Sequence, residues 1–396
     1  MYQYNSPFLP FHDIKILRVP ALLFFIALSL LPFVAAARDS SPPSLPDIDV
    51  RGYFLLDAYS GAVLAEKGAN MRVEPASLTK MMTSYVIFSE LRAGNITLDE
   101  EVLISEKAWR TGGSRTYVEV GTRVPVRVLL MGIIIQSGND ASVALAEHIA
   151  GDESAFVERM NQQAERLGLK GSHFMNSSGL PAANHYTTAR DMAWLGVSLA
   201  RDFPELYKTH AIKSYEYNNI KQYNRNKLLW RDETVDGIKT GYTEAAGYCL
   251  VASARRDDMR LVSVVMGAKS VKSRTKATQT LLNYGFRFFK TRKLYDGNTP
   301  LTIVRVWKGD SDNLDVGLAE PLYITAPNEQ FADLKANIEF NTKIIAPITA
   351  GDIHGKLRIM LGEETILLEK PLISLQSVQE GGLWRQVSDT MKMYFH

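Results

Sequence analysis

A serine and a lysine three positions apart could together carry out nucleophilic catalysis. In Ser77-Leu78-Thr79-Lys80 the hydroxyl and the amine share one face of a predicted helix, within hydrogen-bonding reach. Serine is a poor nucleophile until a base takes its proton, and a lysine whose pKa is lowered by burial or by nearby cations can be that base. The spacing alone is weak evidence, because Ser273-Arg274-Thr275-Lys276 has it too. The surroundings of each serine therefore decide between them.

The surroundings favour Ser77. It follows Pro75 at the start of a predicted helix, where free backbone N–H groups and a partial positive charge stabilise developing negative charge. Ser137-Gly138-Asn139 precedes another predicted helix and offers a second hydroxyl and an amide, and Asp140 is expected to cap that helix.

A third motif, Lys239-Thr240-Gly241, lies in a predicted strand. Its cation and hydroxyl can face a substrate carboxylate, and Gly241 would let the substrate backbone approach the strand closely. Singly, the motifs are better explained as an exposed lysine, a helix cap and a strand turn. Together, in the order S-x-x-K, S-x-N and K-T-G, they indicate serine-based acyl transfer.

The elements that must position these motifs change along the chain. Residues 53–56 and 62–65 form a predicted hairpin, and helical periodicity dominates from Leu78 to about Ala200. Strands return between Val235 and Gly267, and a helix is predicted at Lys276–Phe289. Strands at both ends with helices between them predict an α+β fold in which the terminal strands share one antiparallel sheet. The catalytic domain is therefore expected at residues 45–290.

Beyond this domain the pattern changes to short strands separated by turns, without helical periodicity. The expected strands are 303–307, 322–325, 336–340, 357–361 and 365–368. Such a pattern predicts a small all-β sandwich domain at residues 300–378.

Both ends of the chain carry apolar segments. Near the N-terminus, Lys15 and Arg18 are followed by the apolar run 21–31 and then by Ala35-Ala36-Ala37. This order predicts a secretory signal peptide over residues 1–37. The alternative is an uncleaved N-terminal anchor. Residues 383–396 predict an amphipathic helix that either lies in a membrane interface or docks on the protein.

Composition excludes several classes of function. The formal net charge is +2, so the chain lacks the basic surplus of a nucleic-acid-binding protein. Its single cysteine, Cys249, rules out an intramolecular disulfide and Cys-rich zinc sites, and its apolar neighbours predict a buried thiol. His148, His173 and His185 lack a metal-ligand spacing and are expected to have structural or surface roles. Acyl transfer through a serine needs no metal or organic cofactor, and none is predicted.

The sequence resembles the low-molecular-mass penicillin-binding proteins, serine D-alanyl-D-alanine carboxypeptidases with a C-terminal β domain and an amphipathic membrane anchor. The likeness covers nearly the whole mature chain. It rests on residues 75–83, 136–141, 224–226, 235–243 and 284–289 and on the terminal helix. It implies a β-lactamase/transpeptidase-like catalytic domain and removal of the last D-alanine from peptidoglycan stem peptides, with β-lactams acylating the same serine.

The resemblance also implies a role for each matching residue. Ser77 would be the acylated nucleophile and Lys80 its general base. Ser137 and Asn139 would complete the cleft. Lys239 and Thr240 would bind the terminal carboxylate, Arg225 and Arg274 would support the substrate-binding side of the site, and Gly241 would let the substrate backbone come close. The N–H groups of Ser77 and Tyr242 would form the oxyanion hole. Some family members have His in place of Tyr242, so the resemblance does not carry over the fine control of deacylation.

Several alternatives stay open. A serine β-lactamase shares two of the motifs, but no E-x-x-L-N motif lies between Asp140 and Lys239. A D,D-endopeptidase would use the same groups, and a catalytically weak cell-shape or binding protein would retain the fold. The expected location is the periplasmic face of the bacterial inner membrane, with the membrane surface bound through residues 383–396. The sequence leaves open whether the protein is a monomer or a homodimer.

Overall fold

The computed structural model describes residues 42–340 and 343–395. They form two compact units. The first holds residues 43–293 together with 323–326, and the second holds residues 294–322 and those from 327 onward. The signal peptide predicted for residues 1–37 lies outside the described residues.

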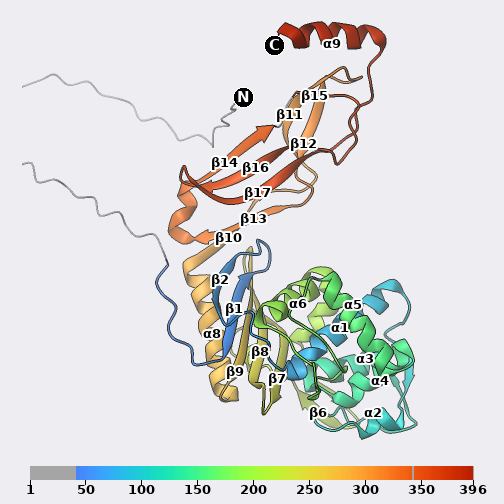
Figure 1. Ribbon diagram of the computed structural model, residues 1–396. Coiled ribbons are helices and arrows are strands. Elements are labelled where there is room, and N and C mark those ends of the chain that lie inside the picture. Colours follow the sequence, from blue (N-terminus) through green and yellow to red (C-terminus); the bar gives the residue numbers. More distant parts are fainter. Residues whose placement is uncertain (1–41, 341–342, 396) are drawn as a thin grey trace, which may run out of the picture. The chain divides into compact units, whose positions relative to one another are not determined.

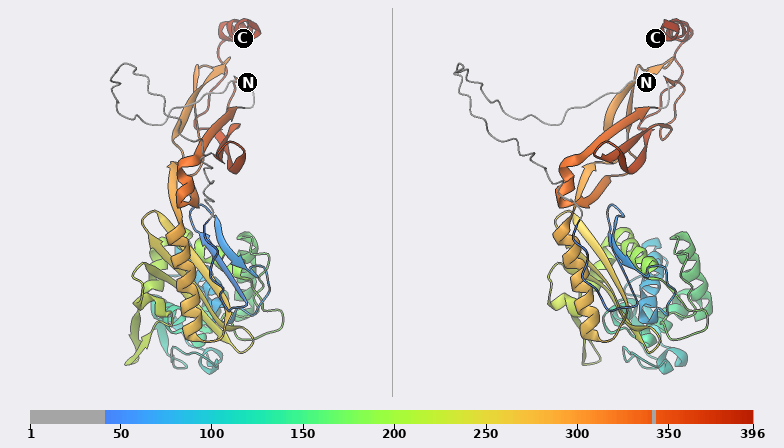
Figure 2. Two further views of the ribbon diagram at one scale, coloured as in Figure 1. Left: turned by 90° about the vertical axis from the view of Figure 1, so that its left-hand side faces the viewer. Right: turned by 60° about the vertical axis from the view of Figure 1, so that its left-hand side comes forward.

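A five-stranded antiparallel sheet lies at the centre of the first unit, in the order β2-β1-β9-β8-β7 (Figures 1 and 2). β1 joins this sheet by pairing with β9, from Gly52 opposite Met266 to Asp57 opposite Leu261. Strands from the two ends of the unit therefore share one sheet, which confirms the predicted α+β fold. The strands are β1 (Gly52–Asp57), β2 (Val63–Lys67), β7 (Val235–Thr243), β8 (Gly247–Arg256) and β9 (Met259–Ala268).

Helices cover both faces of this sheet (Figures 1 and 2). α8 (Val271–Phe288) packs on one face, and a helical group that includes α1 and α6 packs on the other. The helical group is α1 (Thr79–Ala93), α2 (Glu106–Arg110), α3 (Val126–Met131), α4 (Asn139–Ala150), α5 (Glu153–Arg166), α6 (Ala189–Asp202) and α7 (Pro204–Tyr207). Two short hairpins, β3 (Glu101–Leu103) with β4 (Arg123–Pro125) and β5 (Ser214–Tyr217) with β6 (Ile220–Tyr223), complete the unit.

The strand residues alternate between two hydrophobic cores. Phe54 and Leu56 of β1 join the core under the helical group, whereas Leu55 joins Leu281 and Leu282 of α8 on the other side. Successive side chains of a strand point to opposite faces, so a sheet covered on both faces must be apolar at consecutive positions. This explains the consecutive apolar residues 249–252 of β8 and 261–262 and 264–266 of β9.

The second unit is built mainly of strands. Its six-stranded sheet has the order β14-β16-β17-β12-β11-β15, and β10 pairs with β13. Leu314, Val316, Leu357 and Leu372 are fully buried and form part of its core. The predicted C-terminal β domain is therefore confirmed. Its elements are β11 (Pro300–Trp307), β12 (Asn313–Gly317), β14 (Leu334–Phe340), β15 (Ile344–Ile345), β16 (Ile353–Leu361), β17 (Thr365–Ser374) and α9 (Leu383–Phe395). The paired strands β10 (Phe289–Tyr295) and β13 (Leu322–Pro327) fall mostly within the residue ranges of the first unit.

Candidate active site

Ser77 lies in a 3₁₀ turn, Ala76–Leu78, that leads directly into α1. Lys80 is in the first turn of α1, and its side chain is fully buried. Its Nζ lies 3.3 Å from Ser77 Oγ and 2.6 Å from Asn139 Oδ1, and it also donates to the carbonyl oxygen of Ser178. The structure therefore brings the serine hydroxyl and the lysine amine into contact.

The environment of Lys80 favours its neutral form. Burial lowers the pKa of Lys80 to about 7, while the negative charge of Asp140 opposes this shift and the positive charge of Arg225 adds to it. A neutral amine has two N–H donors and one lone pair. If Asn139 and Ser178 accept the two donors, the lone pair is left for the proton of Ser77.

Ser137 and Lys239 form a second contact between a hydroxyl and a lysine amine. Ser137 follows a π-helical turn, Gly132–Gln136, and has a left-handed backbone conformation with φ of 68°. Lys239 Nζ donates to Ser137 Oγ at 2.9 Å and to the carbonyl oxygen of Thr240 at 3.0 Å. Burial holds the pKa of Lys239 well below its usual range, and neighbouring cations add to this effect. A bound carboxylate would oppose both effects and favour the charged amine.

Asp140 does not cap α4, so that prediction is wrong. Gly138 is the residue that precedes α4, and the helix has no side-chain cap. The buried Asp140 carboxylate instead accepts hydrogen bonds from the backbone N–H groups of Thr116 and Tyr117, each at 2.8 Å. These loop N–H groups satisfy a buried negative charge, which would be costly without partners.

The loop that Asp140 holds forms one wall of the site. Asn139 Nδ2 donates to the carbonyl oxygen of Gly112 at 2.7 Å, while Asn139 Oδ1 accepts from Lys80. Ser114, from the same loop, lines the pocket of Ser77. The amide of Asn139 therefore links the position of Lys80 to that of the loop.

Two glycines let other segments lie against the serine turn. A Cβ at Gly241 would be 3.1 Å from the carbonyl oxygen of Pro75 and 3.3 Å from Cβ of Ala76. The glycine thus permits contact between β7 and the serine turn, a reason that differs from the predicted approach of a substrate. Gly179 has φ of +86°, and a Cβ there would overlap the carbonyl oxygen of Ala76.

A pocket of about 220 Å³ opens beside Ser77. Seven of the predicted site residues line it, namely Ser77, Ser137, Arg225, Thr240, Gly241, Tyr242 and Arg274. Lys80, Asn139 and Lys239 do not line it. Lys80 and Lys239 contact the hydroxyls of Ser77 and Ser137, and Asn139 accepts a hydrogen bond from Lys80. All ten predicted residues are therefore part of one constellation.

Arg274 and Tyr242, which both line this pocket, differ in exposure. Arg274 is buried, and its Nη1 donates to the carbonyl oxygens of Gly241 and Cys249, each at 3.2 Å. Burial lowers the pKa of Arg274 to about 10, so the guanidinium stays charged at neutral pH. Tyr242 is exposed, and its ring packs on Tyr248 with centroids 4.3 Å apart.

The rival serine, Ser273, has a structural role. Ser270 and Ser273 form a reciprocal capping box at the start of α8, with Ser273 Oγ accepting from the Ser270 N–H at 2.9 Å. The helix therefore begins at Val271 rather than at the predicted Lys276. The prediction missed this start because the first turn of the helix is mostly polar and shows no apolar periodicity.

Sequence reasoning missed the carbonyl oxygen of Ser178 and the loop contacts of Asp140. A backbone carbonyl can belong to any residue type, so the identity of Ser178 gives no signal. The neighbouring Gly179 offered an indirect one, because a glycine in a polar loop indicates a turn or a close approach. Tyr248 and Val271 also line the pocket without having been predicted.

Comparison with known proteins agrees with this arrangement. Residues 37–270 match the family described as D-alanyl-D-alanine carboxypeptidase, and residues 289–380 match the C-terminal domain of penicillin-binding protein 5. The chain belongs to the D-alanyl-D-alanine carboxypeptidase family.

Individual members of the D-alanyl-D-alanine carboxypeptidase family match over most of the chain. DacA of Escherichia coli is 43% identical over 362 residues, which cover 89% of this chain and 90% of that protein. DacA of Haemophilus influenzae is 40% identical over 380 residues, which cover 94% and 96%. The crystal structure of penicillin-binding protein 5 from Haemophilus influenzae matches with a TM-score of 0.82 and 40% identity, over 85% of this chain and 100% of that chain.

Proposed function

We propose that this chain is a serine D-alanyl-D-alanine carboxypeptidase that removes the terminal D-alanine from the pentapeptide stems of peptidoglycan. One observation carries the proposal. The buried amine of Lys80, with a pKa of about 7, lies 3.3 Å from the hydroxyl of Ser77 at the edge of a pocket lined by two arginines. Family membership supplies the substrate class.

The first half-reaction forms an ester on Ser77. Ser77 Oγ attacks the carbonyl carbon of the penultimate D-alanine while Lys80 takes the hydroxyl proton. The C–N bond then breaks, the departing amine receives a proton through the Ser137 hydroxyl, and D-alanine leaves. In the second half-reaction water attacks the ester and restores Ser77.

The remaining residues bind and stabilise charge. Lys239 and Thr240 hold the terminal carboxylate, with Arg225 and Arg274 beside it, and the backbone N–H groups of Ser77 and Tyr242 are the proposed oxyanion hole. A β-lactam presents a strained amide and a carboxylate in a similar arrangement. It would therefore acylate Ser77, and slow hydrolysis would leave the enzyme blocked.

The function is tested on the full chain in detergent solution with two substrates. Fluorescent penicillin should label the protein covalently, and a peptide ending in D-Ala-D-Ala should release free D-alanine. Absence of both reactions would refute the proposal. Labelling without D-alanine release would favour a catalytically weak binding protein, and rapid repeated hydrolysis of penicillin would favour a β-lactamase.

We infer further that the protein is exported. The order of basic, apolar and small residues at 1–37 supports a signal peptide. Residues 45–290 would be the catalytic domain and residues 300–378 the β domain. The mature enzyme would act at the periplasmic face of the inner membrane. Within the described ranges, no helix has the length and apolar character needed to cross a membrane. The proposed attachment is peripheral, through residues 383–396.

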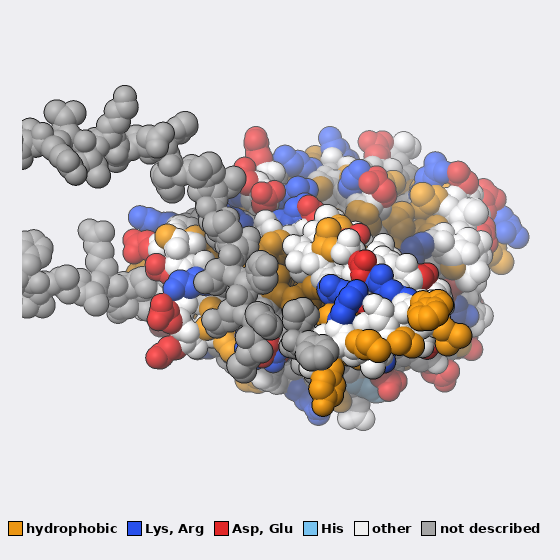
Figure 3. Space-filling view, turned by 90° about the horizontal axis from the view of Figure 1, so that it is seen from above, with side chains coloured by type: hydrophobic (Ala, Val, Ile, Leu, Met, Phe, Trp, Pro, Cys, Tyr) orange, Lys and Arg blue, Asp and Glu red, His pale blue; other side chains and the backbone are white. Residues whose placement is uncertain are grey.

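The geometry of α9 supports this attachment. The carboxylate of Asp389 is fully buried and accepts from the Lys308 N–H at 2.8 Å and from Arg385 Nε at 3.1 Å. At 100° per residue, the apolar stripe of α9 is centred opposite Asp389. Its side chains are strongly exposed, with Trp384 at 90% (Figure 3 views this end of the molecule). The stripe consists of Leu383, Trp384, Val387, Met391 and Tyr394.

Trp384→Glu should move the protein from the membrane fraction to the soluble fraction, because it places a charge in the apolar stripe. Gln162→Glu adds the same charge at an exposed position of α5, outside α9, and should leave the protein on the membrane. Fractionation of cells expressing each variant measures the effect. If both variants stay on the membrane, or if deleting residues 383–396 changes nothing, α9 is not the anchor.

A further inference from the structure

One of the two acceptors of the Lys80 amine belongs to a loop. Lys80 Nζ donates to Asn139 Oδ1, on α4, and to the carbonyl oxygen of Ser178, in the segment between α5 and α6. The lone pair of a neutral amine points where its N–H donors do not, so these two acceptors aim it at Ser77. The position of the Ser178 carbonyl therefore matters for the proposed chemistry, and contacts with other elements must fix it.

The carboxylate of Glu153 makes such a contact. Glu153 is the first residue of α5, and its Oε1 accepts from the Ser177 N–H at 3.1 Å and from Ser177 Oγ at 2.7 Å. Thr83 Oγ1, on α1, donates to the carbonyl oxygen of Ser177 at 2.6 Å. Ser177 and Ser178 are both buried. The backbone and the side chain of Ser177 are thus bonded to two helices, which fixes the peptide group that leads to Ser178.

The hydrogen bonds of Asn176 have a different role. Asn176 Oδ1 accepts from the N–H groups of Ser178 at 3.2 Å and of Gly179 at 2.7 Å. These bonds join residues of the same loop, so they shape the turn without tying it to the rest of the unit. The attachment of the turn to α5 depends on Glu153.

The second oxygen of Glu153 reaches the support of the other acceptor. Lys107 Nζ, on α2, lies 3.0 Å from Glu153 Oε2. α2 ends two residues before Gly112, whose carbonyl oxygen accepts from Asn139 Nδ2. One carboxylate, with a side chain only 15% exposed, therefore joins the supports of both acceptors of Lys80.

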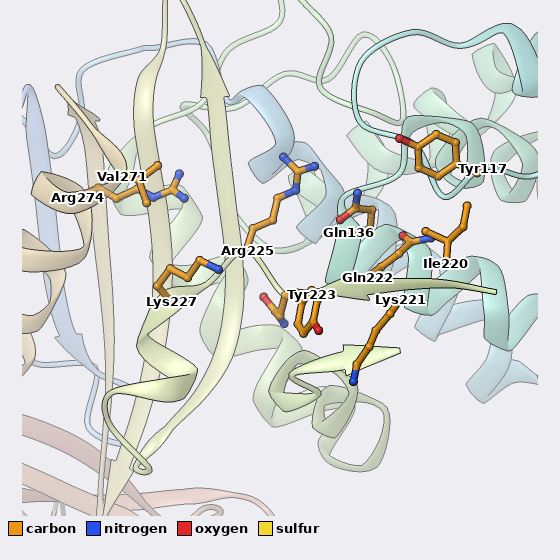
Figure 4. Close-up of a pocket in the computed structure, with 11 residues that line it drawn as sticks. Tyr117, Gln136, Ile220, Lys221, Gln222, Tyr223, Arg225, Lys227, Val271 and Arg274 are labelled. Carbon is orange, nitrogen blue, oxygen red and sulfur yellow. The ribbon is translucent and has the colours of Figure 1, made fainter. Parts of the chain in front are cut away.

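Glu153 acts on Lys80 through position rather than through charge. Burial lowers the pKa of Lys80, and the charges that modify this pKa are those of Asp140 and Arg225. Figure 4 shows Arg225 among the side chains of the neighbouring pocket. Burial would raise the pKa of Glu153, but the hydrogen bonds that its carboxylate accepts hold that pKa below its usual value. The carboxylate is therefore charged at neutral pH and keeps its partners.

We propose that Glu153 is a positioning residue that acts through Lys80. By holding Ser177, it keeps the carbonyl of Ser178 where Lys80 can donate to it. The lone pair of Lys80 then faces Ser77. This inference rests on the function proposed above. The contacts involve α1, α2 and α5, whereas the lysine and threonine proposed to bind the terminal carboxylate belong to β7. Loss of the carboxylate should therefore slow acylation and spare substrate binding.

The test separates binding from acylation on the full chain in detergent solution. Stopped-flow labelling at a series of fluorescent penicillin concentrations gives the dissociation constant of the noncovalent complex and the first-order acylation constant. Glu153→Ala should lower the acylation constant about ten- to a hundredfold and leave the dissociation constant within about twofold, because only the aim of the amine changes. Glu153→Gln keeps an acceptor oxygen for Ser177 and should stay within about threefold of wild type.

Two further measurements distinguish positioning from a general effect on the fold. Ser177→Ala removes one of the two bonds to Glu153 and should lower the acylation constant about threefold; it carries the test if Glu153→Ala does not fold. In a Lys80→Ala background, Glu153→Ala should cause no further loss, because no amine is left to aim.

Glu158→Ala is the matched control, since it removes an exposed carboxylate from the same helix and should change neither constant. The inference is overturned if Glu153→Ala becomes acylated as fast as wild type, if it weakens binding as much as it slows acylation, or if it costs as much in the Lys80→Ala background as in wild type. Each of these results leaves the carboxypeptidase function in place. A wild-type protein that penicillin does not acylate would instead contradict the proposed function, and this inference with it.

Discussion

Ser77→Ala should abolish covalent labelling by fluorescent penicillin and lower D-alanine release by about five to six orders of magnitude. The variant removes the only atom that the proposed mechanism acylates, while Lys80 keeps its bonds to Asn139 and the Ser178 carbonyl. Its folding should therefore be close to that of wild type. Gel fluorescence after labelling and a coupled assay for free D-alanine measure the two effects.

Ser273→Ala is the matched control, because Ser273 has the same spacing to a lysine as Ser77. It breaks the capping box of α8, which is expected to cost about 1 kcal/mol of stability and to lower Tm by about 2–4 °C. Labelling by penicillin should be unchanged below that temperature. If Ser77→Ala still becomes labelled, or if Ser273→Ala does not, the assignment of the nucleophile is wrong.

The sequence was informative where chemistry depends on residue type and on separation along the chain. Three motifs, represented by Lys80, Asn139 and Lys239, are 59 to 159 residues apart in the sequence. They meet at one pocket because β7 lies against the serine turn and α4 begins beside Lys80. Their order and the resemblance predicted this meeting. That β1 and β9 belong to one sheet was predictable for a different reason, since strands at both ends of the domain with helices between them imply a shared antiparallel sheet.

The sequence was uninformative where a residue acts through its backbone or has a choice of partners. The carbonyl oxygen of Ser178 bonds to Lys80 whatever its side chain is. Asp140 could have capped α4 by its position, but the N–H groups of a loop 22 to 24 residues away compete for the same oxygens. Long-range contacts of this kind decide such cases, and local patterns do not contain them.

Acylation of Ser77 should rise with pH through about 7 and then level off. Lys80 acts as a base only when neutral, and burial lowers its pKa to about 7. Below that value the amine is protonated and the rate should fall about tenfold per pH unit, whereas above it the amine is already neutral. Lys80→Ala should lose about 10²- to 10⁴-fold in acylation rate and should lose this inflection as well. Stopped-flow labelling between pH 5 and 9 measures both quantities.

Asp140→Asn separates the charge of Asp140 from its hydrogen bonds. The carboxylate opposes the lowering of the Lys80 pKa, so its neutralisation should move the inflection to lower pH. An amide also cannot accept all the loop N–H groups that the carboxylate accepts, so the plateau rate should fall as the wall formed by Gly112 and Ser114 loosens. Glu158→Gln removes an exposed charge from α5 and should shift neither quantity. If the inflection stays at the same pH in Asp140→Asn, Asp140 acts on the loop alone. If the inflection also persists in Lys80→Ala, a group other than Lys80 titrates.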